Sequence, residues 1–138
     1  MQQLTQEILR LCREYGECRV EVERMEEARR GKNALESVCA MARQRLDISD
    51  PALLLALLDA CEVTRDEGML QEVLDVVGRN LDRLAVSVES VKLLACCYYY
   101  VEEEECVERA GRMLEELRKM GRGEEELADV ETILEELT

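Results

Sequence analysis

The sequence contains no histidine, no phenylalanine and no tryptophan, and it has a single proline, Pro51. Without histidine, the chain cannot form the Glu-x-x-His pattern of helical di-iron sites, and no adjacent base for a cysteine nucleophile can be identified. Without phenylalanine or tryptophan, the core must be filled by Leu, Val, Met, Ala and Cys. One proline and seven glycines predict long helices joined by short connections.

Catalytic and phosphate-binding motifs are also missing. The sequence has no Gly-x-Gly-x-x-Gly, no Gly-x-x-x-x-Gly-Lys-Ser/Thr and no Gly-x-Ser-x-Gly. Its many carboxylates fall in polar runs, whereas acid–base catalysis needs an isolated acid whose pKa is raised by burial. We therefore expect a protein that is not an enzyme and that holds no cofactor.

The seven cysteines do not have the spacing of a metal site. Their number is odd, no Cys-x-x-Cys occurs, and a structural zinc site needs close pairs of cysteine or histidine. We expect them to be reduced, small core residues of an intracellular protein. They are Cys12, Cys18, Cys39, Cys61, Cys96, Cys97 and Cys106. A metal protein built on them is an alternative that predicts bound metal.

The charge is distributed unevenly along the chain. Residues 1–45 carry nine basic and eight acidic side chains, for a net charge of +1, whereas residues 46–138 carry nine basic and twenty-four acidic ones, for a net charge of −15. An acidic surface repels phosphate backbones, so we expect no nucleic-acid partner and a weak preference for a basic one.

We also expect no membrane segment. The chain starts without the pattern of a signal peptide, and its apolar runs, among them residues 52–58 and 93–101, are far too short to span a bilayer. The expected location is the cytoplasm or nucleus.

Apolar residues recur at helical spacing along almost the whole chain, which predicts an all-α domain of about seven antiparallel helices, stacked as helix hairpins. Asp50 and Pro51 predict a helix start, and Asn33 with Glu36 predicts another. We interpret Gly78 as a point where a neighbouring helix approaches closely, in preference to a kink. The expected helices are 2–15, 33–47, 51–64, 67–84, 88–101, 104–120 and 124–137.

Residues 17–30 allow three interpretations. Alternating Cys18, Val20 and Val22 fit a short strand, while the surrounding Glu and Arg residues favour a separate helix, which we prefer. The segment could also continue the first helix, since Gly16 costs only about 1 kcal/mol within a helix. A basic cluster at Arg24–Lys32 is expected to be neutralised by ion pairs within the helix.

The stretch Val88–Val101 is apolar around most of a helix, which predicts a central, buried element. With residues 104–120 it forms a helix pair. The sequence of this pair resembles that of the pair formed by residues 51–64 and 67–84, which lies 36–37 residues earlier in the chain. Residues 1–47 would be divergent N-terminal helices and 124–137 a capping helix, all within one domain, 1–138.

The pair 88–120 resembles a tetratricopeptide repeat. Leu94, Ala95 and Tyr98 stand at the spacing of that family's first helix, and Ala110 and Leu114 at that of its second. The turn is about three residues longer than in the family, and the closing proline is absent. The resemblance implies an α-solenoid whose first helices line a concave, protein-binding groove. The helix pairs of pentatricopeptide-type RNA-binding proteins recur with a similar repeat length, but the net charge of −15 over residues 46–138 argues against RNA binding.

These patterns predict a protein–protein interaction module or adaptor subunit of a larger complex. The alternative is a structural helical bundle that forms an obligate homo- or hetero-oligomer. The partner would be another protein, with a basic or amphipathic segment.

One edge of the predicted helix Val88–Val101 is not needed for core packing and is therefore the candidate binding surface. Three consecutive tyrosines spread over about 200° of a helix, so Tyr98 and Tyr100 can be buried while Tyr99 lies on the remaining side. Tyr99 is either a binding anchor or a residue covered by a neighbouring helix with its hydroxyl in solvent. The candidate partner-binding residues are Lys92, Cys96, Tyr99 and Glu103.

Overall fold

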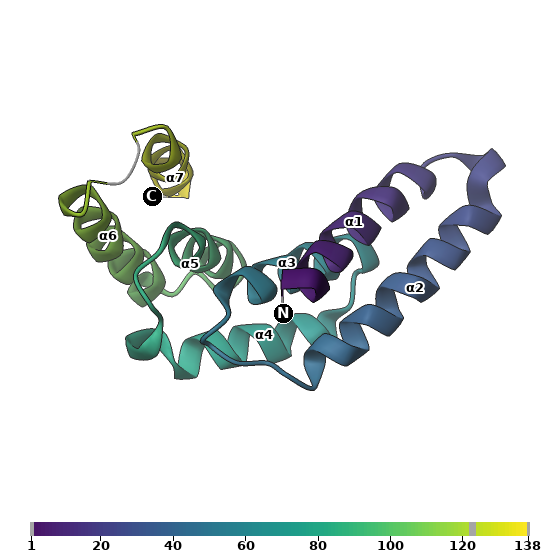
Figure 1. Ribbon diagram of the computed structural model, residues 1–138, viewed down its shortest axis with the longest axis horizontal. Coiled ribbons are helices and arrows are strands. Elements are labelled where there is room, and N and C mark those ends of the chain that lie inside the picture. Colours follow the sequence, from purple (N-terminus) through teal and green to yellow (C-terminus); the bar gives the residue numbers. More distant parts are fainter. Residues whose placement is uncertain (1, 122–123, 138) are drawn as a thin grey trace.

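The computed structural model describes residues 2–121 and 124–137, and over these ranges the chain forms seven α-helices and no strand (Figure 1). The expectation of an all-α chain with about seven helices is confirmed. Short 3-10 turns cover Val22–Arg24 and Leu81–Arg83. The helices are α1 (Gln2–Cys18), α2 (Met25–Arg43), α3 (Pro51–Thr64), α4 (Glu67–Arg79), α5 (Val88–Val101), α6 (Glu104–Lys119) and α7 (Glu124–Leu137).

The odd-numbered helices pack on one another in chain order. α3 lies between α1 and α5, and α5 lies between α3 and α7. Each even-numbered helix packs mainly on the odd-numbered helix before it, α2 on α1, α4 on α3 and α6 on α5. The result is elongated, with the α1–α2 pair at one end and α6 and α7 at the other (Figure 1).

The core is centred on α3 and α5, because each of them packs against odd-numbered neighbours on two sides. Leu57 and Leu94 are both 0% exposed, and each of the two helices has residues buried around most of its circumference. The prediction of a central helix at Val88–Val101 is confirmed. Of the seven cysteines, all of which the structure describes, five are buried in this core, Cys18 is buried at the end of α1, and Cys96 is half-buried.

The N-terminal pair differs from the prediction. α1 continues through Gly16 to Cys18, which is buried at its end, and α2 begins at Met25 rather than at Asn33. The predicted strand, the separate helix 17–30 and the helix start at Asn33 are therefore wrong. Burial of Cys18 outweighs the small cost of Gly16, and Gly31 lies within α2, where it contacts Tyr15 of α1.

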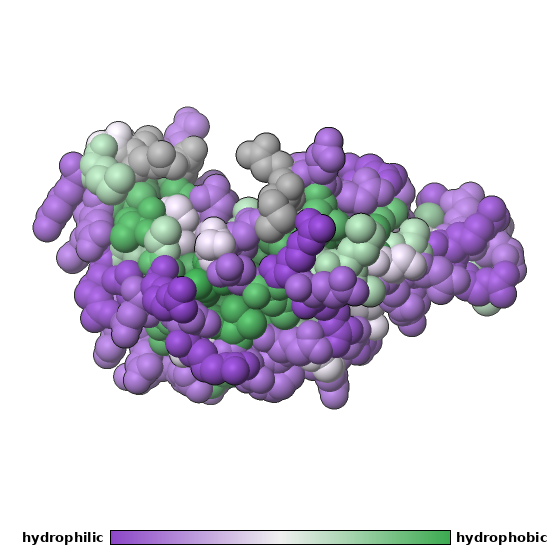
Figure 2. All heavy atoms as spheres, turned by 60° about the horizontal axis from the view of Figure 1, so that its bottom comes forward, coloured by the Kyte–Doolittle hydropathy of each residue, from purple (hydrophilic) through white to green (hydrophobic). Residues whose placement is uncertain are grey.

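Short-range ion pairs lie at the start of α2. Arg24 pairs with Glu27 at 2.9 Å and Arg29 pairs with Glu26 at 2.7 Å. The interpretation of the basic cluster as local ion pairing is confirmed for Arg24, Arg29 and Lys32, the last of which lies 4.0 Å from Glu36. Figure 2 shows that this far end of the α1–α2 pair is covered with hydrophilic residues, while hydrophobic ones gather near the middle of the same face.

Three helix starts lie where local capping chemistry predicts them. The Asp50 side chain accepts a hydrogen bond from the Leu53 amide at 3.2 Å, and Asp66 accepts one from Met69 at 3.0 Å. Ser87 caps α5 in the same way, since its hydroxyl accepts from the Ser90 amide. Because these caps satisfy amides that have no partner within the helix, they define the starts of α3, α4 and α5.

The interpretation of Gly78 as a close-approach residue is wrong. Apart from the chain neighbours of Gly78 and the adjacent backbone of α4, no described atom lies within 4 Å of the position that a Cβ would take there, and the residue is exposed to solvent. α4 also ends at Arg79 rather than near residue 84, because the Asn80 side chain donates a hydrogen bond to the carbonyl of Val76 and a 3-10 turn follows.

Replacing Gly78 with alanine is therefore expected to raise the free energy of unfolding by about 0.5–1 kcal/mol, the helix-propensity difference between the two residues. Urea denaturation followed by circular dichroism measures this change. Gly121→Ala is the contrasting variant, because Gly121 ends α6 with φ +73° and alanine would be strained there. A loss of stability in Gly78→Ala would show that the position is crowded.

Candidate functional site

Tyr99 is the exposed aromatic residue on the central helix. Its side chain is 70% exposed, and its ring meets Tyr100 edge-on with centroids 5.2 Å apart. Lys92 and Cys96, on the same edge of α5, are half-buried. Glu103 lies beyond the end of α5, where it precedes α6 and lines a cavity of about 260 Å³ with residues of α4. Three of the four predicted residues thus share a helix edge, while Glu103 belongs to the α5–α6 turn.

Carboxylates of α3 border this edge of α5. Burial raises the pKa of Cys96, and the negative charges of Asp59 and Glu62 raise it further. Burial also raises the pKa of Tyr100, again with a contribution from Glu62. Asp59 reaches solvent, but the surrounding helices displace enough of its water to raise its own pKa. The exposed ring of Tyr99 therefore belongs to a surface with acidic neighbours, which we call the Tyr99 surface (Lys92, Cys96, Tyr99, Asp59 and Glu62).

The raised pKa of Cys96 predicts a slow, pH-dependent thiol reaction. Because the thiolate is the nucleophile and the pKa lies above the ordinary value of a thiol, Cys96 is protonated at neutral pH. The rate of alkylation at Cys96 is expected to rise about tenfold per pH unit between pH 7 and pH 9. Mass spectrometry of iodoacetamide-treated native protein measures this rate, and the buried neighbour Cys97 provides the internal control. Preferential labelling of Cys97 would contradict the placement of Cys96.

Three buried thiols come together where α1, α2 and α3 meet. Burial raises the pKa of Cys12 and of Cys61 to about 12 and that of Cys39 to about 11. Over residues 2–121 and 124–137, no group of three or more Cys, Asp or Glu side chains is arranged to hold a metal ion. All three side chains are buried and pack within the hydrophobic core.

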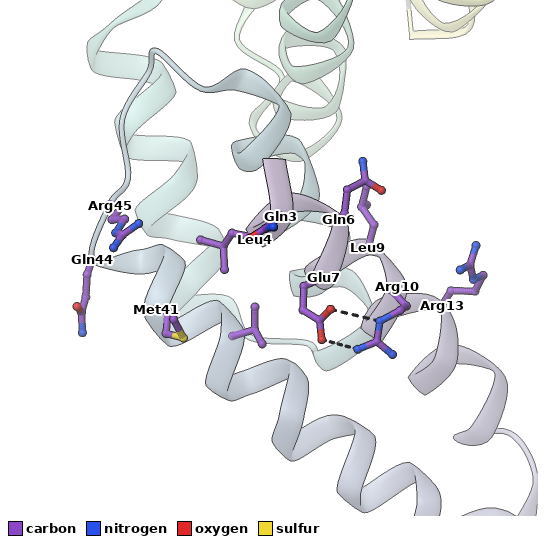
Figure 3. Close-up of a pocket in the computed structure, with 11 residues that line it drawn as sticks. Gln3, Leu4, Gln6, Glu7, Leu9, Arg10, Arg13, Met41, Gln44 and Arg45 are labelled. Atoms are coloured by element: carbon purple, nitrogen blue, oxygen red, sulfur yellow. Dashed lines mark hydrogen bonds and ion pairs between the residues drawn. The ribbon is translucent and has the colours of Figure 1, made fainter. Parts of the chain in front are cut away.

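A groove between α1 and α2, which we call the α1–α2 groove, was not found from the sequence. It encloses about 1200 Å³ and leaves Leu9 37% and Met41 60% exposed (Figure 3). Both residues lie outside the buried stripes of their helices, and nothing in either helical pattern indicates that the two residues line one groove. The lining residues are Gln3, Leu4, Gln6, Glu7, Leu9, Arg10, Arg13, Val38, Met41, Gln44 and Arg45.

Comparison with known proteins supplies no relative. No family model, no curated protein and no solved structure matches the chain. The resemblance of residues 88–120 to a tetratricopeptide repeat therefore stays a prediction. Among the described helices, none combines the length and apolar character needed to cross a membrane.

Proposed function

We propose that this protein is a non-catalytic protein–protein interaction module, an adaptor or scaffold subunit built as a short α-solenoid. The consecutive packing of α1, α3, α5 and α7, with α2, α4 and α6 against them, supports a stack of helix hairpins. In a tetratricopeptide-like stack the first helix of each pair lines the binding groove. The helices α3 and α5 then present the Tyr99 surface.

The exposure of Tyr99 carries the proposal. It is a large aromatic side chain 70% exposed on a helix that is otherwise among the most buried in the chain. Exposed tyrosines contribute strongly to interfaces because they bury a large area and lose little rotamer freedom. Contact with the edge of Tyr100 restricts the ring further, so still less entropy is lost on binding.

The chemistry of the Tyr99 surface defines the partner. Asp59 and Glu62 act electrostatically on Cys96, which lies one turn from Tyr99 on the same edge of α5, and Tyr99 offers apolar area. We infer that the partner presents a basic or amphipathic segment, with an apolar side chain against Tyr99 and a Lys or Arg against the carboxylates. This assignment agrees with the net charge of −14.

Site-specific photo-crosslinking tests this function. A benzoylphenylalanine in place of Tyr99 is expected to crosslink one defined protein in cells that produce this chain. The matched control has the same residue in place of Met120, which is 66% exposed at the C-terminal end of α6. Capture of the same proteins from both positions would contradict a binding role for Tyr99. A crosslink between two copies of the chain would instead support the structural-subunit alternative.

A further inference from the structure

The α1–α2 groove is lined by residues of the N-terminal helix pair, whereas the Tyr99 surface is formed by residues of α3 and α5. Its walls come from α1 and from the second half of α2 with the residues that follow it (Figure 3). Apolar side chains on both walls, Leu4 and Leu9 on one and Val38 and Met41 on the other, give it an apolar surface. An apolar channel between two helices has the shape that binds an amphipathic helix by its apolar face.

The charge of the α1–α2 groove is opposite to that of the protein. The chain carries −14, yet the lining residues include three arginines and one glutamate. Arg10 is neutralised by ion pairs with Glu7 and Glu14. Arg13 and Arg45, in contrast, form no ion pair with any residue that the structure describes.

These two arginines stand on opposite sides of the groove. Figure 3 shows Arg13 on α1 and Arg45 just beyond the end of α2. Because both guanidinium groups are permanently charged, a carboxylate-bearing ligand in the groove would meet a cation on each side. A lysine-rich ligand would meet like charge at both positions.

We propose that the α1–α2 groove binds an acidic amphipathic helix of a partner protein. Apolar residues spaced three and four apart pack on Leu9 and Met41, and Glu or Asp residues along the flanks of that helix pair with Arg13 and Arg45. This inference goes beyond the proposed function, because the Tyr99 surface has the opposite charge preference. The protein then joins two partners of different chemistry, and either surface can fail its test without affecting the other.

A second copy of the chain is a poorer occupant. Its acidic helix is α7, whose sequence from Glu124 to Leu137 contains seven carboxylates and no basic residue. The apolar face of α7 is already occupied, because Leu127, Val130 and Leu134 are buried and α7 packs against α5 and α6. No complete apolar face of α7 remains to enter the groove of another copy.

Fluorescence anisotropy with two synthetic helices tests the proposal on the intact protein. One labelled 18-residue peptide carries Leu at positions i, i+3, i+4 and i+7 with Glu on the flanks, and the other has Lys in place of every Glu. The comparison is made in the Tyr99→Ala background, which removes the anchor that a basic amphipathic helix would use on the Tyr99 surface, and there the Glu peptide is expected to bind at least about tenfold more tightly than the Lys peptide. The double variant R13E/R45E is expected to abolish or reverse that preference.

Two control variants separate charge from packing. R112E/K119E makes the same change in net charge at exposed positions of α6 and is expected to leave the preference unchanged. Met41→Ser removes apolar contact at a residue that is 60% exposed, so the protein should remain folded while both peptides bind more weakly. Circular dichroism of each variant verifies the fold.

Three results would overturn the proposal. Equal binding of the Glu and Lys peptides would exclude recognition by charge, and an unchanged preference in R13E/R45E would place binding elsewhere. Light scattering coupled to size exclusion gives the third. If the protein alone forms oligomers that R13E/R45E dissociates, the α1–α2 groove holds a second copy rather than a partner's helix.

Discussion

Leu94→Ala is expected to lower the free energy of unfolding by about 3 kcal/mol, one of the two largest effects that this structure predicts. Leu94 is 0% exposed on α5, and α5 packs against α3, α6 and α7. Removing its side chain leaves a cavity that the surrounding helices can fill only in part. The protein has no Phe or Trp, so its core depends on such leucines for large buried area.

Urea denaturation followed by far-ultraviolet circular dichroism measures this loss. Leu9→Ala is the matched control, because it removes the same atoms from a helix position that is 37% exposed. We expect the control to cost less than about 1 kcal/mol. Similar losses in the two variants would show that α5 is not the centre of the core.

Tyr99→Ala is expected to weaken binding of the partner captured at position 99 by about 2 kcal/mol, or roughly 30-fold in Kd. The same substitution should lower the free energy of unfolding by less than about 1 kcal/mol, because it removes little more than the edge contact with Tyr100. The two effects differ because Tyr99 faces solvent while its neighbours on α5 face the core.

Isothermal titration with the purified partner measures the affinity, and urea denaturation of the free protein measures the stability. Met120→Ala removes a side chain of similar exposure and should leave both quantities nearly unchanged. A large loss of stability in Tyr99→Ala, with affinity preserved in the folded fraction, would identify Tyr99 as a core residue.

The sequence predicted the helices best where their ends are determined locally. Asp50, Asp66 and Ser87 each cap a helix through a hydrogen bond to an amide three residues later. Such caps depend on neighbouring residues alone, so a linear pattern reveals them. Gly121 follows the end of α6 with φ +73°, a left-handed conformation that favours glycine, so this helix end is also a local signal.

The N-terminal pair was mispredicted because tertiary packing overrode weaker local signals. Gly16 and Asn33 indicated helix ends, yet burial of Cys18 at the end of α1 and of Leu35 in α2 holds both helices through those positions. Gly78 misled the interpretation in another way. A glycine in a helix can mark close packing or merely lower propensity, and only the neighbouring atoms distinguish the two.

Tertiary packing also explains why the sequence predicted the position of Tyr99 but not the α1–α2 groove. The position of Tyr99 on the free edge of α5 followed from helical periodicity, but its exposure depends on how α3 and α7 pack around α5. The α1–α2 groove could not be predicted at all, because Leu9 and Met41 line one groove only through the packing geometry of the helix pair. Residues that share a surface across two helices leave no periodic signal in either one.

Hydroxyl-radical footprinting of the wild-type protein, free and bound to the captured partner, tests most directly whether Tyr99 is a binding residue. We predict that Tyr99 is oxidised readily in the free protein and at least several-fold more slowly in the complex, while oxidation of Met120 stays constant. Protection of Tyr99 in the free protein, or equal oxidation of Tyr99 in both states, would contradict the account.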